Sequence, residues 1–154
     1  IPAHYKWDVI FIDGLHLAYQ VEKDVDNALV HLNPGGVIVM HDCYPFLYDP
    51  NPARLIKDYW GQAWNGTVWK VMHKMVSLRS NVRACTLDID EGVGIVVRND
   101  SKTAGIVPNN YFYEYKVLAE NAKRDLNIIE HGNLLDWLEE NIAIDVAPHN
   151  KTQG

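Results

Sequence analysis

Two continuous apolar runs, separated by an amphipathic segment, dominate the first part of the chain. Residues 9–12 (VIFI) and 37–40 (VIVM) show no polar alternation, which is typical of central parallel strands that are covered on both faces. Between them, apolar residues recur at helical spacing, and the sequence NPGG at residues 33–36 ends the helix. The pattern predicts two parallel strands joined by a right-handed helical crossover.

A second pair of apolar runs, at residues 82–87 and 94–98, flanks the turn sequence DIDEG at residues 88–92. Two strand-like runs around a turn predict an antiparallel hairpin, which we expect at the edge of the sheet. Together with the crossover unit, this hairpin predicts an α/β fold.

Helical spacing recurs in four further segments, namely residues 53–64, 68–72, 111–126 and 134–142. Asn65-Gly66 separates the first two, and Asn133 precedes the last in an N-cap position. We expect residues 1–100 to form the α/β domain, residues 101–146 to form a helical extension packed on it, and residues 147–154 to be a flexible tail.

Composition narrows the class of partner. The chain has 154 residues, of which 47% are hydrophobic and 22% charged, the balance of one folded domain. The net charge of −6 and the lack of a Lys/Arg run argue against nucleic acid and anionic membranes, which leaves a small molecule as the expected partner.

No segment has the length of a membrane span, the start has no signal-peptide layout, and the two cysteines, Cys43 and Cys85, provide no disulfide framework. We therefore expect a cytoplasmic protein with both thiols reduced. Because the chain opens without Met, within a few residues of a buried strand, we also expect it to be the later part of something longer.

Acids and imidazoles follow both strands of the crossover unit: Asp13 and His16 follow the first, and His41 and Asp42 follow the second. Ligands of open α/β sheets bind beyond the carboxyl ends of parallel strands. If the two strands are adjacent, their ends lie about 4.8 Å apart, so Asp13 and Asp42 could share Mg²⁺ or Mn²⁺. A neutral His16 could then accept a proton from a hydroxyl. Each residue alone also fits an ordinary turn or structural role, so the prediction rests on the four together.

The series DVIFIDGLH, LNPGGVIVMHD, WNGTVW and DEGVGIV resembles the carboxyl-terminal half of class I S-adenosylmethionine-dependent methyltransferases. It is most similar to the small-molecule and sugar O-methyltransferases related to macrocin O-methyltransferase and the cephalosporin hydroxylase-like proteins. The resemblance implies a partial Rossmann-like sheet, S-adenosylmethionine as cofactor, and a hydroxyl of a sugar or other small molecule as methyl acceptor.

Carried over by position, the resemblance makes Asp13 and Asp42 ligands of a divalent metal ion and His16 the catalytic base. Asp13 is also the candidate contact with the cofactor. His41 occupies a position at which the macrolide enzymes have a carboxylate. We expect it as a third metal ligand, and a softer ion such as Mn²⁺, or no ion, is compatible with an imidazole there.

Aromatic residues follow the second strand, and Tyr44, Phe46 and Tyr48 are candidate walls of an acceptor pocket, because their rings offer flat apolar faces. The tryptophans at positions 60, 64 and 69 have a spacing that favours packing on the sheet instead.

The chain lacks the glycine-rich loop and the following acid with which such enzymes hold their cofactor. The first strand would therefore lack a neighbour, and its unpaired apolar edge predicts a homodimer. Two functions stay open: metal-assisted O-methyl transfer, or a non-catalytic methyltransferase-derived module that self-associates. Hydrolysis at the same site is less well supported, since no nucleophile is evident.

Overall fold

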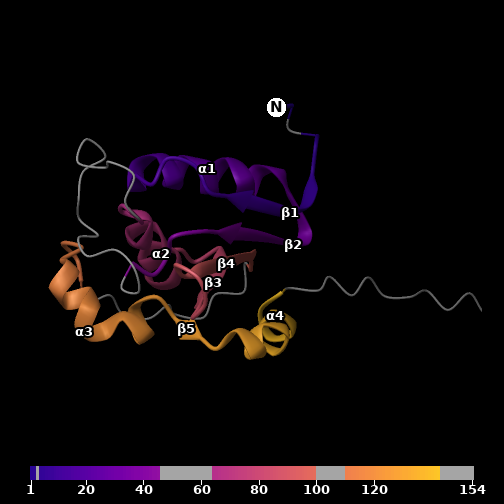
Figure 1. Ribbon diagram of the computed structural model, residues 1–154. Coiled ribbons are helices and arrows are strands. Elements are labelled where there is room, and N and C mark those ends of the chain that lie inside the picture. The colour runs from indigo at the N-terminus through magenta and orange to yellow at the C-terminus, as the bar shows by residue number, and fades with distance from the viewer. Residues whose placement is uncertain (3, 46–63, 100–109, 143–154) are drawn as a thin grey trace, which may run out of the picture.

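A mixed sheet with helices on both faces forms the body of the protein, as the computed structural model shows (Figure 1). The structure describes residues 1–2, 4–45, 64–99 and 110–142. Its elements in chain order are β1 (Trp7–Ile12), α1 (Ala18–His31), β2 (Leu32–Met40), α2 (Val68–Ser77), β3 (Val82–Leu87), β4 (Val93–Arg98), α3 (Tyr115–Asp125), β5 (Ile128–Ile129), the 3₁₀ helix η2 (His131–Asn133) and α4 (Leu134–Asn141).

The strand order in the sheet is β1-β2-β4-β3-β5. β1 and β2 are parallel and joined by α1, which confirms the predicted crossover unit. β3 and β4 form the predicted antiparallel hairpin. The expected edge position of this hairpin was wrong, because β4 pairs antiparallel with β2 and the short β5 pairs parallel with β3.

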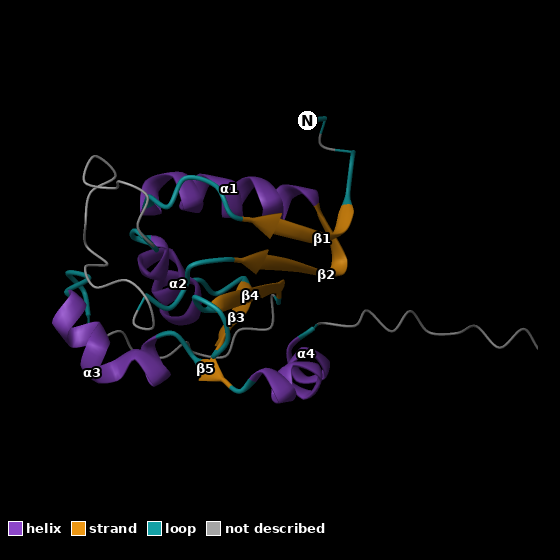
Figure 2. Cartoon of the chain, viewed as in Figure 1, coloured by secondary structure: helices purple, strands orange, loops and turns teal. Residues whose placement is uncertain are grey.

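β1, not the hairpin, forms a long edge of the sheet (Figure 2). Among the described residues it pairs with β2 alone, and the Val9 and Phe11 side chains are 64% and 62% exposed. The prediction that β1 is covered on both faces was therefore wrong. The corresponding prediction holds better for β2, which lies between two strands and buries Ile38 and Met40 completely.

The larger core lies between one face of the sheet and the helices α1, α2 and α3. On this face the inward side chains of β2, β3 and β4 meet the apolar stripes of the helices. Trp69 from α2 is the largest fully buried side chain of this core, so packing explains at least one of the tryptophans. A smaller cluster on the opposite face joins β3 and β4 to α4.

The helix ends depart from the predicted ones in places. α1 ends at His31, just before the predicted NPGG stop, and the residues of that stop already belong to β2. α3 begins at Tyr115 rather than at residue 111, because the Asn110 side chain bonds both backbone groups of Glu114 and Tyr113 has a positive φ of 54°. Asn133 is the N-cap residue of α4, without a side-chain hydrogen bond.

Cys43 and Cys85 are both free and buried, as expected. In the part of the chain that the structure describes, no helix combines the length and the apolar character that crossing a bilayer requires. The predicted helix at residues 53–64, apart from Trp64, and the predicted tail at 147–154 lie outside the described residues.

Candidate functional site

The carboxyl ends of β1 and β2 bring the four predicted residues to one edge of the sheet. Ile12 is in register with Met40, so Asp13 and His41 directly follow paired positions. The His41 amide donates a hydrogen bond to the Ile12 carbonyl at 3.1 Å, which continues the pairing one step beyond the strands. The parallel arrangement predicted from the apolar runs thus carries the polar residues to the same place.

Asp13, His16 and Asp42 form the tightest group. His16 Nε2 lies 3.3 Å from Asp13 Oδ1 and 3.0 Å from Asp42 Oδ2. One potential ligand atom from each of the three residues lies within 4.8 Å of the other two. Asp42 is buried, His16 half-buried and Asp13 exposed, so the group is open to solvent on the Asp13 side.

The backbone after β2 turns sharply to hold Asp42 in the interior. Asp42 has a φ of 61°, a conformation that non-glycine residues adopt rarely and that Asp tolerates better than most. The next amides, of Cys43 and Tyr44, donate to the carbonyls of Gly92 and Glu91, both at 2.9 Å. The turn between β3 and β4 therefore fixes the segment that carries Asp42.

His41 lies between two carboxylates. Its Nδ1 is 3.2 Å from Asp42 Oδ2, and its Nε2 is 2.8 Å from Asp90 Oδ2. Partial burial lowers the pKa of His41, but hydrogen bonds to Asp90 and Asp42 and the charges of both acids outweigh it, so the pKa is raised above 6.5. Both ring nitrogens are thus occupied as donors to acids when the ring is protonated.

Asn65 links Asp42 to a further acid. Its amide nitrogen donates to Asp42 Oδ1 at 2.8 Å and to Glu91 Oε2. Burial, together with a hydrogen bond to Asp42 and its negative charge, raises the pKa of the Glu91 carboxyl. Four acids therefore converge here: Asp13, Asp42, Asp90 and Glu91.

Sequence reasoning missed Asn65, Asp90 and Glu91. The segments WNGTVW and DEGVGIV contain them and contribute to the resemblance, but Asp90 and Glu91 were interpreted as part of a hairpin turn and Asn65 as a break between helices, with no role in the site. The density of acids in DIDEG was the one available signal, because a tight hairpin needs fewer carboxylates than this turn carries.

Of the predicted metal ligands, His41 lies beside the tight group and contacts only Asp42 of its three members closely. His41 Nδ1 is 4.0 Å from Asp13 Oδ1, whereas His16, predicted as the base, joins both aspartates directly. The structure thus brings together all four predicted residues and gives the two histidines different surroundings.

Of the predicted pocket aromatics, only Tyr44 is described; Phe46 and Tyr48 lie outside the described residues. Tyr44 is half-buried beside Gly92, whose added Cβ would lie 2.3 Å from the Tyr44 Cβ. Burial, with a smaller effect of the Asp88 charge, raises the pKa of the Tyr44 phenol.

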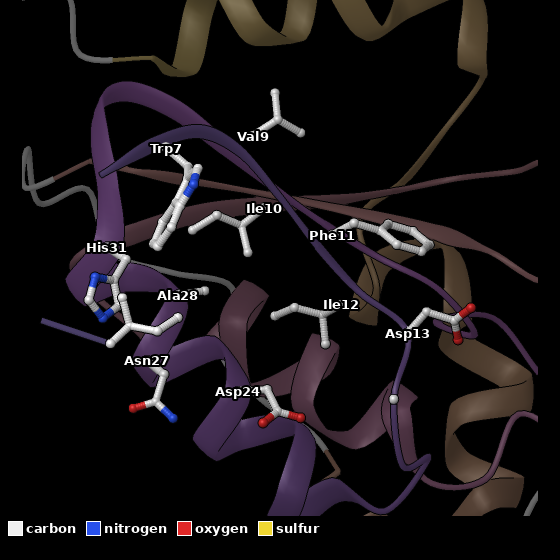
Figure 3. A pocket seen from close by; sticks show the side chains of 12 residues that line it. Trp7, Val9, Ile10, Phe11, Ile12, Asp13, Asp24, Asn27, Ala28 and His31 are labelled. Carbon is white, nitrogen blue, oxygen red and sulfur yellow. The ribbon is translucent and has the colours of Figure 1, made fainter. Parts of the chain in front are cut away.

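A cavity of about 610 Å³ runs along the free edge of β1 and ends at Asp13 and Gly14 (Figure 3). Its walls are the apolar side chains of β1 and the α1 residues Asp24, Asn27, Ala28 and His31. The cavity is open and mostly apolar, with its acids gathered at the end nearest the candidate site.

The donor set fits a divalent cation. Two carboxylates and an imidazole suit Mg²⁺ or Mn²⁺ in ligand type, and water could complete the coordination on the exposed side. Asp42 is nearly fully buried among further acids, an arrangement that a cation would stabilise.

Comparison with known proteins covers only the first part of the chain. Residues 3–43 match a family model described as a methyltransferase domain. The match contains β1, α1, β2 and all four residues at the strand ends, and it supports a methyltransferase domain there. No curated protein and no solved structure matches the chain.

Proposed function

We propose that this chain provides the hydroxyl-acceptor side of a methyltransferase that uses S-adenosylmethionine and a divalent metal ion, and that resembles the macrocin O-methyltransferase group. The observation that carries the proposal is the convergence of Asp13, His16 and Asp42 at the ends of two parallel strands. The segment that contains them is also the one that matches a methyltransferase domain. The acceptor would be a sugar or another small hydroxyl compound.

Asp13 and Asp42 are the proposed metal ligands. Asp42 Oδ1 accepts a hydrogen bond from Asn65, while Oδ2 lies toward the His16 ring. A bound Mg²⁺ or Mn²⁺ would orient the acceptor oxygen and lower the pKa of its hydroxyl. Asp13, on the exposed side, is also the proposed contact with the cofactor, which would supply the methyl group.

His16 is the proposed base. Its Nδ1 is 2.8 Å from the Trp64 carbonyl oxygen, which can only accept, so Nδ1 carries a proton and Nε2 is the ring nitrogen left for proton exchange with the acceptor. Nε2 lies within the candidate centre, where it can take the proton of the acceptor hydroxyl. His41 would have to give up a carboxylate partner to ligate a metal, so it is the less favoured third ligand.

The test measures Mn²⁺ binding to the chain by calorimetry and electron paramagnetic resonance. Asp42→Asn should remove most of the affinity, because a buried ligand loses its charge. Asp136→Asn, in the first turn of α4, is the matched control and should bind as the unchanged chain does. Failure of the unchanged chain to bind Mn²⁺ or Mg²⁺ would contradict metal assistance.

Activity is measured as transfer of a labelled methyl group from S-adenosylmethionine to a panel of sugars and other small alcohols. His16→Gln should abolish transfer and leave Mn²⁺ binding largely intact if His16 is the base. Nitrogen couplings to bound Mn²⁺ that disappear in His16→Gln would instead make His16 a ligand. Lack of transfer to every acceptor would count against catalysis by this chain.

A second candidate function is that of a non-catalytic module that self-associates. The observation that favours it is the free edge of β1, where Val9 and Phe11 are mostly exposed. We propose a second copy of the chain as the partner of this edge, since an unpaired apolar strand is a template for pairing.

A further inference from the structure

One short segment, Trp64 to Thr67, contacts both His16 and Asp42, the two less exposed residues of the candidate centre. We refer to it as the 64–67 turn; it leads directly into α2. It lies more than 20 residues from Asp42 in sequence and further still from His16.

The 64–67 turn holds His16 at both its ring and its backbone. The Trp64 carbonyl accepts the hydrogen bond of His16 Nδ1 at 2.8 Å, and the two rings stack with centroids 5.7 Å apart. The Thr67 amide donates to the His16 carbonyl at 2.8 Å. The Thr67 hydroxyl also accepts the Ala18 amide at 2.8 Å, so the first residue of α1 is fixed as well.

Gly66 permits this close approach. Its φ is +61°, and a Cβ at this position would lie 2.1 Å from the His16 carbonyl oxygen and 2.7 Å from the His16 Cβ. Both contacts are far inside van der Waals distance, and the backbone atom cannot move aside alone. Only glycine therefore allows the turn to lie against His16 in this way.

Asn65 acts on the other side of the centre. It is 1% exposed, and its amide nitrogen donates to one oxygen of Asp42 and to Glu91. An amide that holds Oδ1 fixes the rotation of the carboxylate, so Oδ2 lies 3.0 Å from His16 Nε2. A neutral donor achieves this without adding a charge of either sign to the centre.

We propose that the 64–67 turn positions the candidate centre, with Asn65 as the positioning residue for Asp42 and the Trp64 carbonyl as the group that holds His16 Nδ1. The inference rests on the proposed metal centre, though not on methyl transfer. Groups that hydrogen-bond to a metal ligand without touching the metal fix the orientation of that ligand and tune its basicity. Their loss typically lowers metal affinity by about 10–100-fold.

The first experiment compares Mn²⁺ affinity in the unchanged chain and in Asn65→Leu, which keeps the side-chain size and removes the amide. We expect dissociation constants about 10–100-fold higher in the variant. Asn121→Leu is the matched control, because it also removes an amide that donates a hydrogen bond, here to the main-chain carbonyl of Val117 within α3 and away from the candidate centre. Equal affinity in the unchanged chain and a folded Asn65→Leu would overturn the proposal.

Asn65 is buried, so its replacement can also impair folding. Thr67→Val and Thr67→Ser provide a second comparison, since serine keeps the hydroxyl that accepts the Ala18 amide and valine removes it. We expect weaker Mn²⁺ binding in Thr67→Val and recovery in Thr67→Ser. Equal binding in both folded variants would contradict a positioning role for Thr67.

A second readout requires no metal. Nitrogen-15 chemical shifts of the His16 ring at one fixed pH report whether Nδ1 carries a proton. We expect a proton on Nδ1, held by the Trp64 carbonyl, and an unprotonated Nδ1 would overturn the proposal whether or not metal binds. If Mn²⁺ fails to bind but His16 keeps Nδ1 protonated, the proposed metal centre fails and the positioning of His16 stands.

Discussion

His41 Nε2 lies 2.8 Å from Asp90 Oδ2 and thereby connects the end of β2 to the turn between β3 and β4. Asp90 has a φ of 51°, which asparagine tolerates as well as aspartate does, so Asp90→Asn removes the charge without a backbone penalty. From this pair we predict how the stability of the protein changes with pH.

Burial lowers the pKa of His41, but the hydrogen bond to Asp90 is the first of several contributions that raise it above 6.5. A histidine with a raised folded-state pKa stabilises the protein fully below the unfolded-state value, about 6.5, and the stabilisation is lost as pH rises through the folded-state value. In metal-free protein, Asp90→Asn should lower the pKa of His41, measured by NMR titration. Its destabilising effect should be larger at pH 5.5 than at pH 9; an equal effect at both would contradict the assignment.

Gly66→Ala should destabilise the chain by more than about 1 kcal/mol, because alanine is strained at positive φ and its Cβ would collide with the His16 carbonyl. Gly132→Ala is the control, since no atom lies within 4 Å of an added Cβ there. The control should change stability by no more than about 0.5 kcal/mol. Denaturant unfolding of both variants measures the difference, and equal midpoints would refute the close contact.

Neither cysteine should react with a thiol reagent at pH 8 while the chain is folded. Burial raises the pKa of the Cys85 thiol to about 12 and also raises that of Cys43, so little thiolate forms and little of it is accessible. Both should react in denaturant. Rapid modification of either thiol in the folded chain would contradict this prediction and show that the residues around that thiol move apart to expose it.

Association through β1 is tested by light scattering after gel filtration. The unchanged chain should behave as a dimer, and Val9→Lys combined with Phe11→Lys should behave as a monomer, because charges on a strand edge oppose pairing. Leu135→Lys, on α4 and 72% exposed, is the control for removal of an exposed apolar side chain. A monomeric unchanged chain at all concentrations would exclude the self-associating module.

Local sequence patterns predict much of this fold because the required signals are local. The apolar runs of β1, β2 and the hairpin each identify a strand, and parallel β1 and β2 necessarily carry Asp13 and Asp42 to one edge. An apolar run shows that the side chains of a strand can be buried, but it does not show which strands or helices lie next to that strand. For this reason the exposure of Val9 and the internal position of β4 were not predicted.

The remainder of the site depends on sheet order. Glu91 and Asp90 reach Asp42 and His41 because β4 pairs with β2, and no periodicity in the sequence specifies that choice. The contact of Asn65 with Asp42 follows from where α2 begins, which is a tertiary property. Likewise, no local sequence pattern predicts the hydrogen bonds between the 64–67 turn and His16.

The pairing of β2 with β4 also affects how the candidate centre forms during folding and how it is lost on heating. The groups around Asp42 come from segments far apart in the chain, and such contacts require the closure of long loops, which slows folding. Apart from the local pair of Asp13 and His16, the candidate centre therefore depends on the completed sheet. Heat inactivation of any chemistry there should coincide with cooperative unfolding of the sheet and should not precede it.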